Sequence, residues 1–101
     1  FDFVRTYLTT EGVRGCAFLN MAADFPDPAS PPRRAIAAIK GGLRDRVARL
    51  VGEALPDVPA ATAERRAGAV FLLLEGALAD ATAFDSLWPL DTARAAAEDL
   101  L

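Results

Sequence analysis

The chain has 101 residues, of which 52% are hydrophobic and 25% are charged; this composition fits one small folded domain and excludes a disordered chain. Its formal net charge is -3, so the chain has no overall positive field with which to hold a nucleic-acid backbone. A single cysteine, Cys16, excludes an internal disulfide, and we find no long apolar run or signal-peptide pattern, so we expect a cytoplasmic protein without a membrane segment.

The first two predicted helices are short. Apolar residues at helical spacing predict a helix over residues 1–10, which Gly12 would end. A second helix is predicted over residues 15–25, and it ends at Pro26 because the residue before a proline is pushed out of the helical region. The sequence begins without Met in what resembles the middle of a helix, so we expect a fragment of a longer protein.

The third predicted helix is long. Ser30 precedes two prolines and is expected to be its N-cap, since proline is tolerated in the first turn of a helix. Apolar residues then recur at three- and four-residue steps from Ile36 to Leu55. Gly41 and Gly42 interrupt this pattern and predict a kink or a close contact with another helix.

Two further helices complete the pattern. Thr62 is the predicted N-cap of a fourth helix that runs to about Phe84, and Asp91 is expected to cap a last helix through Leu101. The sequence shows no strand-like alternation and no internal repeat. The predicted fold is therefore all-α, a small bundle of about five helices in one domain.

The centre of the fourth helix is apolar on every side. Residues 70–74, Val-Phe-Leu-Leu-Leu, step around more than a full turn at about 100° each. A second copy of the chain is the simplest cover for such a helix, and Gly68 and Gly76 would allow close approach. The alternative is that helices of the same chain already cover both sides.

The composition offers little for catalysis. The chain has no histidine, which removes the commonest general base, metal ligand and activator of a nucleophile. Cys16 lies in an apolar context and is expected to be an inert buried thiol. Asp24 and Asp27 flank Pro26 without further ligands nearby, so they are expected to be solvated turn residues. We therefore expect no enzymatic activity, no metal and no cofactor.

Asn20 and Glu75 are polar residues placed among large apolar ones. A buried carboxylate must be paired or neutralised, so Glu75 is expected to pair with an arginine such as Arg14 or to reach water. Asn20 would bond a neighbouring backbone group. The other interpretation of both residues is direct contact with a bound small molecule.

Residues 15–28, GCAFLNMAADFPDP, resemble a stretch found in a large subgroup of TetR-family transcriptional regulators. The order of later features is similar too: Pro32-Arg33 lead into a helix with Lys40 and Leu43, and LLLEGA follows at residues 72–77. The similarity covers the chain from Tyr7 to its end.

The resemblance implies that residues 1–101 form a C-terminal regulatory domain. Such a domain forms a homodimer and binds a small hydrophobic effector, whereas DNA is bound by an N-terminal helix-turn-helix unit that this sequence lacks. An effector would release DNA by favouring a state in which the two DNA-binding units are wrongly spaced, as in a repressor.

The resemblance and the residue pattern together name two candidate sites. The dimer interface is expected in the last two helices, at Val70, Leu72, Leu73, Gly76, Ala77, Ala97 and Leu100. The effector pocket is expected among the first four helices, at Tyr7, Phe18, Leu19, Asn20, Met21, Phe25, Phe71, Leu74 and Glu75. The alternative function is a helical homodimerisation module whose small aliphatic residues pack without an effector pocket.

Overall fold

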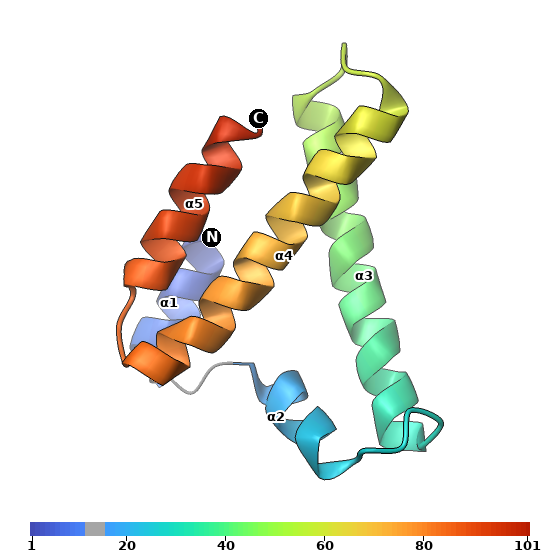
Figure 1. Ribbon diagram of the computed structural model, residues 1–101, viewed down its shortest axis with the longest axis vertical. Helices are drawn as coiled ribbons and strands as arrows, with labels where there is room; N and C mark the ends of the chain where they lie inside the picture. The colour runs from blue at the N-terminus through green and yellow to red at the C-terminus, as the bar shows by residue number, and fades with distance from the viewer. Residues whose placement is uncertain (12–15) are drawn as a thin grey trace.

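The computed structural model describes residues 1–11 and 16–101, and within those ranges the chain consists of helices and turns without a strand. The helices, labelled in Figure 1, are α1 (Asp2–Glu11), α2 (Ala17–Asp24), α3 (Pro31–Ala54), α4 (Ala60–Phe84) and α5 (Trp88–Asp99). The prediction of a small all-α bundle of five helices is thus confirmed for the described residues.

Ser30 occupies the N-cap position of α3, as predicted, but its side chain does not cap the helix. Its hydroxyl instead donates a hydrogen bond to the carbonyl oxygen of Asp27 at 2.8 Å. The two prolines that follow supply the first turn, where a missing N–H leaves no helical bond unmade. The predicted end of the first helix at Gly12 lies outside the described residues.

The starts of α4 and α5 differ from the prediction. α4 begins at Ala60, with Pro59 rather than Thr62 in the N-cap position. α5 begins at Trp88, three residues before Asp91, and Pro89 occupies its first turn. In both cases a proline at the start of the helix, before it in α4 and in its first turn in α5, fixes the local backbone and outweighs the side-chain capping preference of the later residue.

α4 is the central helix, with α3 packed on one side and α5 on the other (Figure 1). One core cluster forms where α1, α4 and α5 meet, from Leu8, Ala77, Ala81, Leu90 and Ala93. A second forms where α3, α4 and α5 meet, from Val51, Leu55, Ala67, Val70 and Ala97. Because α4 contributes to both clusters, its position fixes the positions of its neighbours.

α1 lies antiparallel to α5 and is held by both packing and charge. Leu8 is almost completely buried in the first core cluster. Arg94 donates to Asp2 at 2.6 Å, and Arg5 forms an ion pair with Asp91, which lies one turn before Arg94 in α5. These exposed pairs fix the register of α1 on α5 and contribute little stability themselves.

Gly41 and Gly42 lie within a continuous α3, and the predicted close contact with another helix is wrong. A Cβ added to either residue would meet no atom within 4 Å. The two glycines therefore weaken α3 without any packing gain among the described residues.

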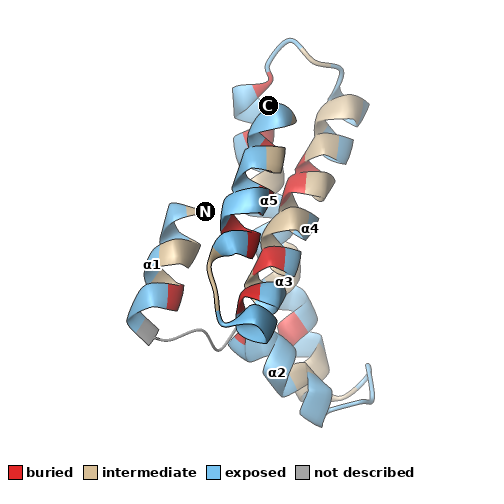
Figure 2. Cartoon of the chain, turned by 60° about the vertical axis from the view of Figure 1, so that its left-hand side comes forward, coloured by how far each residue is buried: buried red, intermediate tan, exposed pale blue. Residues whose placement is uncertain are grey.

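The chain forms a flat slab rather than a rounded bundle. Its extents are 43 × 33 × 17 Å, so one dimension is about half of the next. Its accessible surface of 6535 Å² exceeds by about 1,000 Å² that expected for a self-contained protein of this mass. Buried residues are concentrated on α4 and α5, whereas no residue of α2 is buried (Figure 2).

α4 also has the length and composition of a membrane-crossing helix. It has 25 residues and contains an 18-residue stretch with a mean hydropathy of 1.5. This differs from the expectation that no segment of the chain could span a bilayer. About 22% of that stretch is buried, and α4 is packed between α3 and α5.

Candidate dimerisation face and effector pocket

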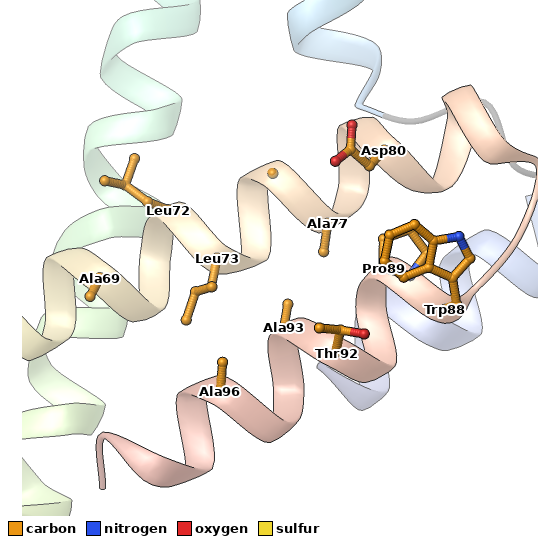
Figure 3. A pocket seen from close by; sticks show the side chains of 11 residues that line it. Ala69, Leu72, Leu73, Ala77, Asp80, Trp88, Pro89, Thr92, Ala93 and Ala96 are labelled. Carbon is orange, nitrogen blue, oxygen red and sulfur yellow. The ribbon is translucent and has the colours of Figure 1, made fainter.

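An apolar groove of about 380 Å³ runs between α4 and α5 on the surface of the chain (Figure 3). We name its lining the dimerisation face, after the function proposed for it below: Ala69, Leu72, Leu73, Gly76, Ala77, Asp80, Trp88, Pro89, Thr92, Ala93 and Ala96. Its two largest side chains are well exposed, with Leu72 at 68% and Trp88 at 49%. Full burial of a large apolar side chain is favourable by about 1.5–3 kcal/mol. Covering these two side chains with a partner would therefore be favourable.

Small residues line the middle of the dimerisation face. A Cβ added to Gly76 would meet no atom of the chain within 4 Å, so the backbone of α4 is open to close approach there. Ala69 and Ala96 flank the same groove. At one end of it, Trp88 packs edge-on against Phe84, with ring centroids 5.1 Å apart, which orients the indole.

The structure divides the seven predicted dimer residues into two groups. Leu72, Leu73, Gly76 and Ala77 line the dimerisation face. Val70 and Ala97 are buried in the second core cluster, and Leu100 packs against that cluster. Trp88 was missed by sequence reasoning, although the only tryptophan of a small chain, beside an expected helix start, was a usable signal.

A second pocket, of about 320 Å³, lies where α3, α4 and α5 diverge beside the start of α1. We name it the effector pocket, after the function proposed for it below, although only Leu74 of the nine predicted ligand residues lines it. Its lining is Phe1, Asp2, Val47, Leu50, Val51, Val70, Leu74, Arg94, Ala97, Glu98 and Leu101. Its lining is mostly apolar, with charges confined to Asp2, Arg94 and Glu98. The Arg94 guanidinium pairs with the carboxylate of Asp2 at 2.6 Å and with that of Glu98 at 3.2 Å. All three charged side chains therefore have a partner of opposite charge within the pocket lining.

The nine predicted ligand residues are dispersed in the structure. Leu74 lines the effector pocket, while Tyr7 packs against the first core cluster and Phe71 is half-buried on α4. The α2 members are exposed: Phe18, Leu19, Asn20, Met21 and, just after the helix, Phe25. Glu75 is engaged in an ion pair. The sequence did not identify Leu50 and Val47 as pocket residues. Both belong to the apolar stripe of α3, and their spacing does not distinguish a residue that lines a pocket from one that packs in the core.

Glu75 and Lys40 form an ion pair between α4 and α3, and Lys40 also reaches the end of α2. The ammonium of Lys40 donates to the Glu75 carboxylate and, at 3.2 Å, to the sulfur of Cys16. Both charged side chains are largely shielded, at 20% and 15% exposure. Burial acts to lower the pKa of Lys40, but its bonds to Glu75 and Cys16 outweigh burial, and the net pKa lies above the usual 10.5.

Among the described residues, Lys40 rather than an arginine is therefore the partner of Glu75; Arg14 lies outside them. Cys16 is buried, as expected, but its sulfur accepts a hydrogen bond instead of having only apolar neighbours. The described residues contain no group of acidic, cysteine or histidine side chains suited to a metal ion.

Comparison of the chain with family models, with curated proteins and with solved structures found no match. The resemblance to TetR-family regulators rests on the motif residues 15–28 and the order of features that follows them.

Proposed function

We propose that the chain is the regulatory domain of a TetR-like transcriptional regulator, which forms a homodimer through the dimerisation face and binds a small hydrophobic effector. The observation that carries the proposal is the uncovered apolar groove on a slab with about 1,000 Å² more exposed surface than a self-contained protein needs. DNA would be bound by an N-terminal unit that is not in this sequence.

A two-fold dimer would place the same α4–α5 face of each copy against the other. A standard interface buries about 800 Å² on each partner, which is close to the excess surface of this chain. The exposed Leu72 and Trp88 would supply the large apolar contacts, and Gly76 would let the two α4 helices approach. Two-fold interfaces are the commonest among homo-oligomers and need one self-complementary face.

The effector pocket has the size and lining of a small-molecule site. Its volume of about 320 Å³ is at the lower end of the range of about 300–1,000 Å³ for ligand pockets. α4 and α5 line both this pocket and the dimerisation face. A ligand that holds α3 and α5 at one separation would therefore bias the geometry of the dimer, and its differential affinity for the two states would drive the switch.

Two matched substitutions test the proposal. Leu72→Glu and Leu50→Glu each introduce a carboxylate at an exposed leucine, one on the dimerisation face and the other in the effector pocket. We expect Leu72→Glu to yield monomers in sedimentation velocity and Leu50→Glu to remain dimeric. If both variants keep the mass of the unsubstituted protein, the α4–α5 groove is not the interface.

The alternative function is a homodimerisation module without an effector, which the modest volume of the pocket favours. A thermal-shift screen of small hydrophobic molecules separates the two functions. A bound compound at about 100 times its Kd adds about 2.7 kcal/mol to the stability of the protein, and Leu50→Glu should abolish that gain. A flat screen would support the module.

A further inference from the structure

α4 carries a symmetric order of side chains on the side that lines the dimerisation face. Leu72 and Leu73 are at its centre, Ala69 lies three positions before Leu72, and Gly76 lies three positions after Leu73. All four residues line the groove. An identical helix lying against this side in the opposite direction would meet leucine with leucine and small residue with small residue.

Two oppositely charged residues extend this order toward both ends of α4. Arg65 lies seven positions before Leu72, and Asp80 lies seven positions after Leu73. Seven residues make about two helical turns, so each charged residue lies on nearly the same side of α4 as the leucine from which it is counted. Asp80 lines the dimerisation face at the end where Trp88 lies (Figure 3).

Neither of these charges has an ion-pair partner in the part of the chain that the structure describes. Both residues are exposed. Arg65 donates one long hydrogen bond, of 3.5 Å, to the hydroxyl of Thr62 one turn earlier. Both charges are therefore available to a second copy that covers the dimerisation face.

The direction of the second α4 decides which charges meet. In a parallel two-fold pair, Arg65 would lie against the partner's Arg65 and Asp80 against the partner's Asp80, and like charges repel. In an antiparallel pair that crosses at Leu72 and Leu73, each Arg65 lies opposite the partner's Asp80. Charge complementarity therefore favours the antiparallel arrangement, in which Ala69 also lies opposite the partner's Gly76.

The charged groups of such a pair are within reach of each other. Each charged residue is about 11 Å along α4 from the crossing point, because about 7.5 residues rise by about 1.5 Å each. Helices of a bundle cross at about 20° with axes about 8–10 Å apart, so the axes remain about 9–11 Å apart at the charged residues. The long side chain of Arg65 can span that separation to a carboxylate.

We propose that two copies of the chain pack with their α4 helices antiparallel and crossing at Leu72 and Leu73, and that Arg65 of each copy forms an ion pair with the partner's Asp80. These contacts presuppose the proposed dimer and fix its direction and register. A shift of one copy by a helical turn would separate both ion pairs, so the pairs select one register of an otherwise apolar contact.

Exchange of the two charges tests this register in the full chain. Arg65→Glu or Asp80→Arg alone places like charges together twice in each dimer, so sedimentation equilibrium should show a dimer Kd at least about tenfold weaker. The double variant Arg65→Glu with Asp80→Arg restores opposite charges, and its Kd should return to within about threefold of the unsubstituted value. Arg44→Glu is the control, because it reverses an exposed charge on α3 whose pair is with Asp45, and it should leave the Kd unchanged.

The outcomes separate the register from the dimer itself. An unsubstituted protein that is monomeric overturns both. A dimer that survives each single charge reversal with an unchanged Kd, or that the double variant fails to recover, overturns the register and leaves the dimer standing. Circular dichroism of each variant confirms that the helices have formed.

Disulfide cross-linking provides a second, independent readout of direction. With Cys16 replaced by Ser, the double variant Ala69→Cys with Gly76→Cys should cross-link two chains under mild oxidation. Each single variant should not, because identical positions lie about 10.5 Å apart in the antiparallel register, which is beyond the reach of a disulfide. The same distance prevents a bridge within one chain. Cross-linking of each single variant would indicate parallel helices and overturn the proposal.

Discussion

Glu75 and Lys40 lie 35 positions apart in sequence, yet their charged groups meet between α3 and α4. The sequence predicts that a carboxylate beside an apolar run needs a positive partner. It cannot name that partner, because the rotation of α3 against α4 is set by how their apolar stripes pack. Lys40 was visible only as one of several cations on α3.

Substitution of Lys40 by Met should produce a pH-dependent loss of stability. The folded-state pKa of Lys40 is raised, so its stabilising contribution is fully present below the unfolded-state pKa near 10.5 and is lost as pH rises through the higher folded value. Urea unfolding should give Lys40→Met a free energy of unfolding about 1–3 kcal/mol below that of the unsubstituted protein at pH 8. That difference should shrink above pH 10.5; a constant difference would contradict the assignment.

Gly42 and Gly76 form a matched pair for testing the dimerisation face. Each lies within a helix, and at each an added Cβ would meet no atom of the chain within 4 Å. Replacement by Ala should raise helix stability by about 1 kcal/mol at both positions. Gly76→Ala should also weaken the dimer in sedimentation equilibrium, whereas Gly42→Ala should not. Equal dimer affinities would argue against close approach at Gly76.

At the scale of elements, the sequence predicts the number, order and approximate extent of the helices because apolar spacing and prolines are local signals. The predicted starts of α4 and α5, at the possible capping residues Thr62 and Asp91, are too late in the sequence. Pro59 and Pro89 are the stronger signals of a helix start. The sequence predicts α2 as a helix too. Its exposure was not predictable, since Phe18 and Met21 have the composition of a buried face.

The attachment of α1 should depend on Leu8, the most deeply buried side chain of that helix. Leu8→Ala leaves a cavity between α1, α4 and α5 and should lower the free energy of unfolding by about 2–5 kcal/mol. Phe3→Ala is the control, because Phe3 is exposed and its removal should change stability by less than about 0.5 kcal/mol. Chemical denaturation of both variants checks the prediction; similar midpoints would mean that α1 is not docked through Leu8.

At the scale of the whole molecule, the apolar segment at residues 70–74 is only partly covered by its own chain. Val70 is buried and Leu73 is half-buried, whereas Leu72 remains in water. The sequence indicates that this segment needs apolar contacts on every side. It does not indicate how many of those contacts come from other helices of the same chain. The structure answers that question for the described residues, because Leu72 is exposed and lines the open groove between α4 and α5.

Sedimentation equilibrium of the unsubstituted protein at micromolar concentration tests the central claim most directly. A dimer through the α4–α5 groove predicts a mass twice the chain mass of 10.7 kDa, falling toward the single-chain value in Leu72→Glu. A stable single-chain mass for the unsubstituted protein across that concentration range would contradict the proposed dimer and leave the regulator assignment supported by resemblance alone.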